Sequence, residues 1–134
     1  MRTKRFIAKT PPLPFAHGKF NGYVAVPPEH PLWGKTYDDE QFPALDVHGG
    51  VSYTESCTYG KRTSTAKCEI TPCLVGGVNL LLKDGEMLDG CIPGDWWIIG
   101  FDTCHLNDTP EEWDRQAVID ETTNLQKQLE KLWK

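Results

Sequence analysis

The chain has 134 residues, of which 39% are hydrophobic, 10% aromatic and 25% charged, and its formal net charge is −5. This length suffices for one compact domain with one hydrophobic core, and the composition is that of a globular protein. A negatively charged chain is a poor general nucleic-acid binder, because such a protein needs a basic face, and no apolar run approaches the roughly 18 residues of a membrane helix.

The first residues and the cysteines bear on the compartment. The basic stretch MRTKRFIAKT is followed by PPLPF instead of the apolar core of a signal peptide. The chain has five cysteines, so they cannot all pair with one another, and none belongs to the C-x-x-C clasp of a structural zinc site. We therefore expect a cytoplasmic protein whose thiols are mostly reduced.

The first third of the chain, residues 1–46, is rich in proline and predicts an irregular segment. The runs PPLP and VPPEHP oppose regular structure, because proline lacks a backbone N–H and restrains the residue before it. Within this segment we expect one short strand, Gly22–Val26. The aromatic stretch HPLWGKTYDDEQFPAL that follows is expected to wrap over the core.

The strand signals lie in residues 47–104. The stretch VSYTES contains β-branched and aromatic residues, and DWWIIGF is a continuous apolar run of strand length. A run of that kind is typical of a central strand that is covered on both faces. Between the two, a hairpin is expected to place Cys57 opposite Cys68, and the apolar run before Asp84-Gly85 ends in a tight-turn signal.

The C-terminal segment changes to a helical period. Thr109 is the expected N-cap, Pro110 the first helical residue and Glu112 the capping-box residue, which predicts a helix over residues 110–133. Apolar residues recur at three- and four-residue spacings, so one stripe of this helix can lie on a sheet. Together these elements predict a single α+β domain with a mainly antiparallel sheet packed by the C-terminal helix.

One group of polar side chains is expected to converge. If the strand after His48 pairs antiparallel with the strand Trp96–Phe101, then His48, Asp102 and His105 meet at one edge of the sheet. Two imidazoles and a carboxylate can hold a divalent metal or orient a phosphate or ribose group, and Gly49-Gly50 permit a close backbone approach. The simpler alternative is that these side chains only cap the turn after the strand.

Several motifs of the chain resemble those of a group of small bacteriophage and prophage proteins. The shared motifs are HGGVSY, WWIIGFD and the CH pair ahead of a polar C-terminal helix, preceded by GYV and HPLWGKTYDD. The resemblance covers most of the chain outside residues 58–93. It places His48, Gly49, Gly50, Asp102 and His105 at recurrent positions of the group. It implies a phage accessory protein that acts in the host cytoplasm, and it carries no activity with it.

Three functions fit such a protein. The favoured one is binding and sequestration of a small nucleotide-like immune signal of the host, with its base stacked on aromatic rings and its phosphates on Lys35, Arg62 or the helix start. A metal-assisted or His/Asp hydrolase and a protein–protein inhibitor are the alternatives. We favour binding over catalysis, because the polar group lacks an evident nucleophile. The residues expected to line the site are His48, Gly49, Gly50, Trp33, Lys35, Tyr53, Trp96, Trp97, Asp102 and His105.

Neither a cofactor nor a membrane partner is expected. The sequence PLWGKT has the end of a phosphate-binding loop, but Glu29 stands where that motif needs its first glycine. The identity of any metal and the state of self-association are left open by the sequence.

Overall fold

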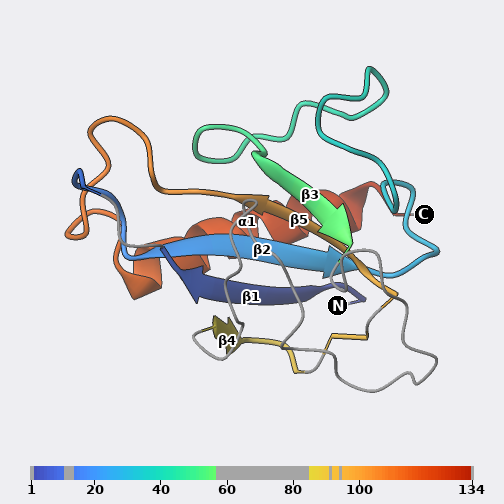
Figure 1. Cartoon of the computed structure of the whole chain (residues 1–134). Helices are drawn as coiled ribbons and strands as arrows, with labels where there is room; N and C mark the ends of the chain where they lie inside the picture. The colour runs from blue at the N-terminus through green and yellow to red at the C-terminus, as the bar shows by residue number, and fades with distance from the viewer. Residues whose placement is uncertain (1, 11–13, 57–84, 91, 94, 134) are drawn as a thin grey trace.

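The computed structural model describes residues 2–10, 14–56, 85–90, 92–93 and 95–133, and these form one sheet and one helix (Figure 1). The elements are β1 (Lys4–Lys9), β2 (Phe20–Val26), β3 (Tyr53–Ser56), β4 (Gly85–Met87), β5 (Trp97–Phe101) and α1 (Arg115–Lys131). The prediction of an α+β fold, with an antiparallel sheet packed by a C-terminal helix, is confirmed. Where the chain is described, no helix has the length and apolarity needed to cross a membrane.

The sheet has five strands in the order β3-β5-β2-β1-β4, and every neighbouring pair is antiparallel. The apolar run predicted as a central strand is confirmed as β5, which lies between β3 and β2. Ile99 and Phe101 of β5 belong to the core on the helix side, whereas Ile98 belongs to the core on the opposite side. Both faces of this strand are therefore covered.

The prediction that residues 1–46 are irregular apart from one strand is wrong. Strand β1 precedes the proline run, and β2 begins two residues earlier than expected, at Phe20. Phe6, Ile7 and Ala8 of β1 are all buried, but they stand between basic residues and show no alternation. This strand is defined by its pairing with β2 on one side and β4 on the other, which its local sequence does not reveal.

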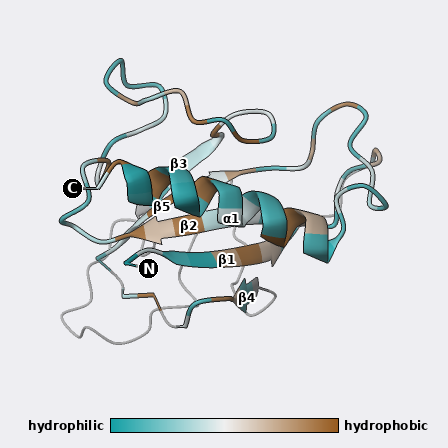
Figure 2. Ribbon diagram, turned by 180° about the vertical axis from the view of Figure 1, so that it is seen from behind, coloured by the Kyte–Doolittle hydropathy of each residue, from teal (hydrophilic) through white to brown (hydrophobic). Residues whose placement is uncertain are grey.

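Helix α1 covers one face of the sheet (Figure 2). Its buried residues pack with side chains of β1, β2 and β5, and they are Val118, Thr122, Leu125, Gln126 and Leu129. Gly22 of β2 permits this close approach, since a Cβ there would lie 2.1 Å from Thr122 Oγ1 and 2.6 Å from the Phe101 ring. The opposite face buries Phe6 and Tyr23, whose rings stack with centroids 4.9 Å apart.

The helix starts later than predicted, at Arg115 instead of residue 110, and its N-cap is Asp114 instead of Thr109. Thr109 closes a separate turn, in which its carbonyl accepts from Trp113 N–H at 2.9 Å. The Trp113 carbonyl does not continue this turn into the helix, because it accepts from Lys19 N–H at 2.9 Å. The sequence contains two helix-start signals, at Thr109 and at Asp114. The hydrogen bond between Trp113 and Lys19, in the loop before β2, selects the second. The predicted hairpin of Cys57 and Cys68, and Arg62 within it, lie outside the described residues.

Replacing the N-cap should reveal which start signal is used. The Asp114 side chain accepts from Ala117 N–H at 2.9 Å, so Asp114→Ala should lower the free energy of unfolding by about 0.5–2 kcal/mol. Thr109→Ala is the matched control and should cost less, since the Thr109 hydroxyl accepts one longer bond of 3.2 Å outside the helix. Urea denaturation followed by circular dichroism measures both. A larger loss for Thr109→Ala would contradict this assignment.

The ion pair between Arg5 and Asp89 should make stability depend on pH in the acid range. The side-chain hydrogen bonds from Arg5 lower the pKa of Asp89 to about 2, against the opposing effect of burial. A lowered folded-state pKa stabilises the fold above the ordinary value of 3.8 and ceases to do so as the pH falls through about 2. The wild type should therefore lose up to about 2 kcal/mol more than Asp89→Asn between pH 5 and pH 2.

Denaturant midpoints measured across that range test the expectation, with Asp46→Asn as a control for a carboxylate on the surface. Equal losses in the wild type and Asp89→Asn would show that this ion pair contributes nothing to the acid dependence.

Candidate functional site

Three side chains form a compact polar group at one end of the sheet, which we call the His–Asp cluster: His48, His105 and Asp108. His48 comes from the loop before β3, and the other two come from the loop after β5. Because β3 and β5 pair antiparallel, with Tyr53 opposite Gly100, these two loops emerge side by side. One nitrogen of each imidazole and one oxygen of the carboxylate lie within 4.8 Å of one another.

Asp108 is the centre of the cluster. Its carboxylate oxygens lie 2.9 and 3.1 Å from His48 Nε2, and one of them lies 2.9 Å from His105 Nδ1. That same oxygen accepts from the His105 backbone N–H at 2.9 Å. On the far side of the His105 ring, Nε2 lies 3.4 Å from Asp102 Oδ1. His105 therefore stands between two carboxylates.

The cluster has a buried centre and an open rim. The Asp108 side chain is 6% exposed, whereas those of His48 and His105 are 25% and 37% exposed. Burial by itself would raise the pKa of Asp108, but the hydrogen bonds from the His105 backbone and from both imidazoles outweigh it and lower the pKa. The carboxylate is therefore an anion at neutral pH, held in place by polar donors instead of by water.

The loop 46–52 is shaped to hold the two rings. Gly49 and Gly50 both have positive φ angles, of 69° and 78°. A Cβ at Gly49 would lie 2.4 Å from His105 Cε1, so the imidazole lies directly on this glycine. The close approach that the glycine pair predicts is therefore made to His105.

Helix α1 and the turn before it fix His48. The backbone N–H of His48 donates to Glu121 of the helix at 2.9 Å, and its ring packs on Trp113 with centroids 4.2 Å apart. Neither partner is among the residues that the sequence predicts for the site. It also placed Asp108 at the helix start and not among the site residues. The i, i+3 spacing of His105 and Asp108 was the signal available, because a turn brings such residues together.

The structure divides the predicted site residues into two separate sets. His48, Gly49, Gly50, Asp102 and His105 meet at one end of the sheet, as the antiparallel pairing predicts. Trp97 lies at the other end of β5, four residues from Phe101, which is about 13 Å along a strand. Its indole N–H donates to the Lys35 carbonyl at 2.9 Å. Trp33 and Trp96 lie at the same end as Trp97, whereas Tyr53 lies at the cluster end of β3, opposite Gly100, with its ring in the core on the face opposite α1.

Each of these three aromatic residues has a structural contact of its own. Trp33 donates to the Asp95 carbonyl at 2.8 Å, and its ring lies against Trp97. Trp96 packs against the core on the face opposite α1, and Tyr53 is buried within that core. The structure therefore does not bring the predicted aromatic residues and the predicted polar residues together at one place, and the single site built from both sets stays a prediction. The alternating faces and the length of β5 separate them.

Cys104 is next to the cluster but is not an activated nucleophile. Its thiol is about half-buried, and burial, together with the negative charges of Asp102 and Asp108, raises its pKa to about 11. At neutral pH the thiol is therefore protonated, whereas a nucleophilic cysteine needs its thiolate. The adjacent CH pair does not supply a Cys–His catalytic pair by this chemistry.

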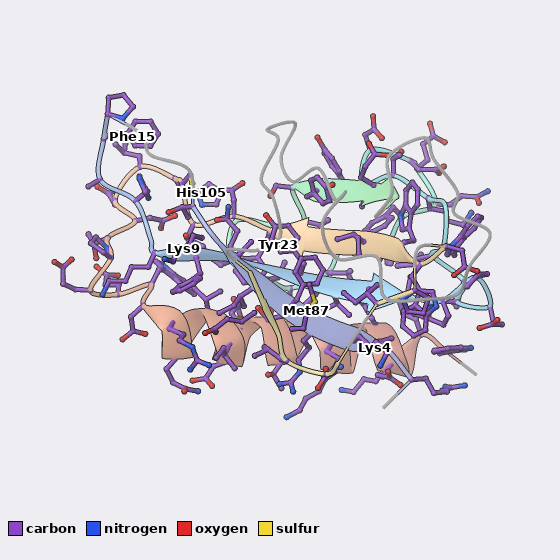
Figure 3. The ribbon with its side chains drawn as sticks, turned by 60° about the horizontal axis from the view of Figure 1, so that its bottom comes forward. Lys4, Lys9, Phe15, Tyr23, Met87 and His105 are labelled. Atoms are coloured by element: carbon purple, nitrogen blue, oxygen red, sulfur yellow. The ribbon has the colours of Figure 1, made fainter. Side chains whose placement is uncertain are left out.

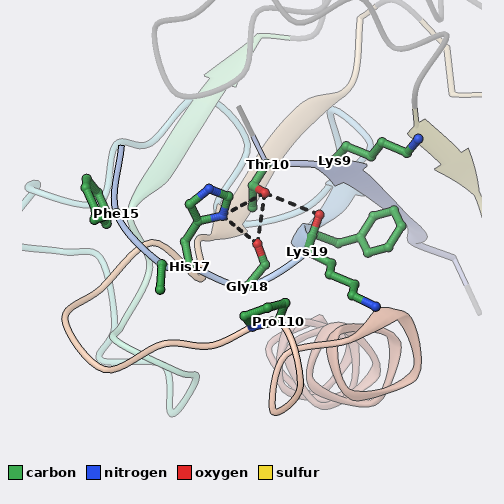
Figure 4. Close-up of a pocket in the computed structure, with 9 residues that line it drawn as sticks. Lys9, Thr10, Phe15, His17, Gly18, Lys19 and Pro110 are labelled. Carbon is green, nitrogen blue, oxygen red and sulfur yellow. Dashed lines mark hydrogen bonds between the residues drawn. The ribbon is translucent and has the colours of Figure 1, made fainter. Parts of the chain in front are cut away.

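Two pockets adjoin the same end of the sheet, and they share Phe15 and Ala16. The first, which we call the Phe15 pocket, has a volume of about 480 Å³ (Figure 4). Its lining residues are Lys9, Thr10, Phe15, Ala16, His17, Gly18, Lys19, Phe20 and Pro110. The second measures about 510 Å³ and is lined by Phe15, Ala16, Cys104, Leu106, Asn107, Asp108 and Thr109. Asp108 thus belongs both to the cluster and to a pocket wall.

The two pockets and the cluster lie in one region of the molecule. Figure 3 shows Phe15, Lys9 and His105 toward one end, with Lys4 toward the other. Each pocket falls within the 300–1,000 Å³ range that is usual for small-molecule sites. No protein-family model, curated protein or solved structure matches the chain. Function is therefore inferred from the chemistry of this region.

Substitution of the glycine beneath His105 should disturb the cluster. Gly49→Ala introduces a methyl group that overlaps the imidazole and strains a positive φ, so it should cost about 1–3 kcal/mol and displace the His105 ring. Gly50→Ala is the matched control, because it has the same strained backbone but nothing within 4 Å of its Cβ. Denaturation midpoints and the NMR shifts of the histidine rings measure the two effects. Equal losses and an unmoved His105 signal would refute the contact.

Proposed function

We propose that the protein binds a small nucleotide-like molecule at this end of the sheet and holds it without converting it. The observation that carries the proposal is the Phe15 pocket, an apolar hollow with two lysines at its edge in a chain of net charge −5. The Phe15 ring is 51% exposed and has room for a partner on its face. Such a combination suits a ligand with a flat aromatic part and an anionic part.

The two parts of the ligand have separate partners. Lys9 and Lys19 are exposed, and neither ammonium group has an ion-pair partner within the described residues, so both are available to a phosphate. Phe15 and Pro110 offer apolar surface to a base. The adjoining pocket extends this surface toward Asn107 and Thr109, whose polar groups suit a ribose. This proposal replaces the tryptophans by Phe15 and replaces Lys35 by Lys9 and Lys19.

The pocket chemistry favours binding over turnover. Cys104 is protonated at neutral pH, and the Asp108 carboxylate is already engaged by two imidazoles and a backbone N–H. A His/Asp hydrolase is the second candidate, since His105 lies between two carboxylates and is 37% exposed, as a general base would be. The resemblance to phage proteins supports the proposed setting, which is capture of a host immune signal in the cytoplasm.

Calorimetry with a panel of nucleotide signals tests the proposal. The double variant Lys9→Gln, Lys19→Gln removes two charge-assisted contacts and should weaken binding of a phosphate-bearing ligand about tenfold to a hundredfold or more. Lys35→Gln is the matched control and should change nothing, because Lys35 lies at the other end of the sheet and its ammonium donates to Gln41. Phe15→Ala should also weaken binding, with the equally exposed Tyr37→Ala as its control.

The fate of the ligand separates the two candidate functions. After incubation and heat release, recovery of the intact compound by mass spectrometry supports sequestration. Recovery of a cleaved product indicates the hydrolase. If no member of the panel binds, or if the lysine and Phe15 variants bind as the wild type does, the proposed site is wrong.

A further inference from the structure

We propose that the His–Asp cluster is a binding site for a divalent transition-metal ion of the zinc type, held by His48 Nε2, His105 Nδ1 and Asp108. This goes beyond the proposed ligand binding and does not depend on it, because the three donor atoms converge without any contribution from the Phe15 pocket. Three arguments support the site: the spacing of its donors, their chemical type and the contacts that hold them from behind.

The donor atoms are spaced for one ion. A zinc ion 2.0–2.1 Å from its ligands in tetrahedral geometry separates each pair of them by roughly 3.4 Å. In the cluster, the two imidazole nitrogens lie 2.9 Å from the nearest Asp108 oxygens, and all three donor atoms fall within 4.8 Å. To hold the ion, the pairs at 2.9 Å open by roughly 0.5 Å, and donor atoms as far apart as 4.8 Å close by roughly 1.4 Å, which are movements of side chains alone.

The donor set selects the class of metal. Two imidazole nitrogens with one carboxylate oxygen suit zinc, cobalt, nickel or ferrous iron, whereas magnesium and calcium prefer oxygen ligands alone. Three protein ligands leave at least one coordination position for water or another small ligand. That position faces the solvent, since His48 and His105 form the exposed rim while Asp108 lies beneath them.

The contacts behind the ligands orient them for metal binding. Asp102 lies 3.4 Å from His105 Nε2, so it can accept the proton of that nitrogen and leave Nδ1 free to coordinate. The His48 backbone is tied to Glu121, and the His48 ring packs on Trp113. Asp102 is thus a positioning residue, and its carboxylate completes the carboxylate–histidine–metal arrangement that is usual in zinc proteins.

The negative charge of the carboxylates at the cluster also favours a bound cation. Asp108 is 6% exposed, and within the described part of the chain its only ion-pair partners are the two histidines. Asp102 adds a second carboxylate on the other side of His105. A divalent cation between the imidazoles would neutralise this negative charge.

Titration of the whole protein with zinc or cobalt alone, without any nucleotide, tests the inference. His48→Gln and His105→Asn are the informative variants, because their amide nitrogens can replace Nε2 and Nδ1 as donors to Asp108. They should therefore retain the fold while losing the imidazole lone pairs. We expect the affinity for zinc in calorimetry to fall more than about a hundredfold in each, and about tenfold to a hundredfold in Asp102→Asn. Asp46→Asn controls for surface charge and should bind as the wild type does.

Cobalt identifies the ligands directly. The cobalt-loaded wild type should show NMR signals from imidazole protons strongly shifted by the paramagnetic ion. The difference spectrum between the wild type and His48→Gln should contain ligand-field bands without sulfur-to-metal charge transfer. The inference is overturned if the wild type binds neither ion, if the histidine variants bind as tightly as the wild type, or if the bound cobalt shows thiolate ligation alone. Loss of nucleotide binding in the Lys9 and Lys19 variants would leave this result unaffected, so the two proposals fail independently.

Discussion

The buried carboxylate of Asp108 is the constraint on which the architecture of this end of the molecule depends. An anion removed from water must be compensated by donors, and here they come from two loops that are 60 residues apart in sequence. His48 supplies one donor, while the backbone and ring of His105 supply the others. The carboxylate thereby joins the loop before β3 to the loop after β5 and fixes the end of both strands.

The two ends of the sheet carry different groups of side chains. One end carries the His–Asp cluster and the pockets around Phe15, and the other carries Trp33 and Trp97, which lie against each other and donate to backbone carbonyls. The tryptophans therefore fasten the wrapping loop to the sheet. The end with the cluster retains partly exposed imidazole rings, lysines that have no ion-pair partner in the described part of the chain, and open volume, which are the properties of a site that meets a ligand.

The sequence predicts those features that depend on local pattern and misses those that depend on distant partners. The continuous apolar run of β5 and the pairing of β3 with β5 follow from composition and direction, and with them the meeting of His48 and His105. Strand β1 has no local signal, because its pattern is set by two neighbours in the sheet. The pair Thr109-Pro110 predicts a helix start directly after Asp108, whereas the hydrogen bond from Lys19 N–H to the Trp113 carbonyl ends that turn before the helix. Aromatic richness indicates stacking surfaces, but the face and the position of each ring depend on the tertiary packing.

The place of β5 between β2 and β3 also determines when the molecule can form. Strands β2 and β3 are not hydrogen-bonded to each other and touch through the rings of Tyr23 and Tyr53, so the sheet stays open between them until residues beyond 96 have been added to the growing chain. Contacts between residues far apart in sequence carry a large entropic cost of loop closure. They therefore favour slow folding, in which the sheet forms late. The loops that carry the His–Asp cluster come together when β5 pairs with β3. Occupation of that end by any partner would therefore slow the unfolding of the entire sheet, and would be seen as protection of β5 amides from hydrogen exchange.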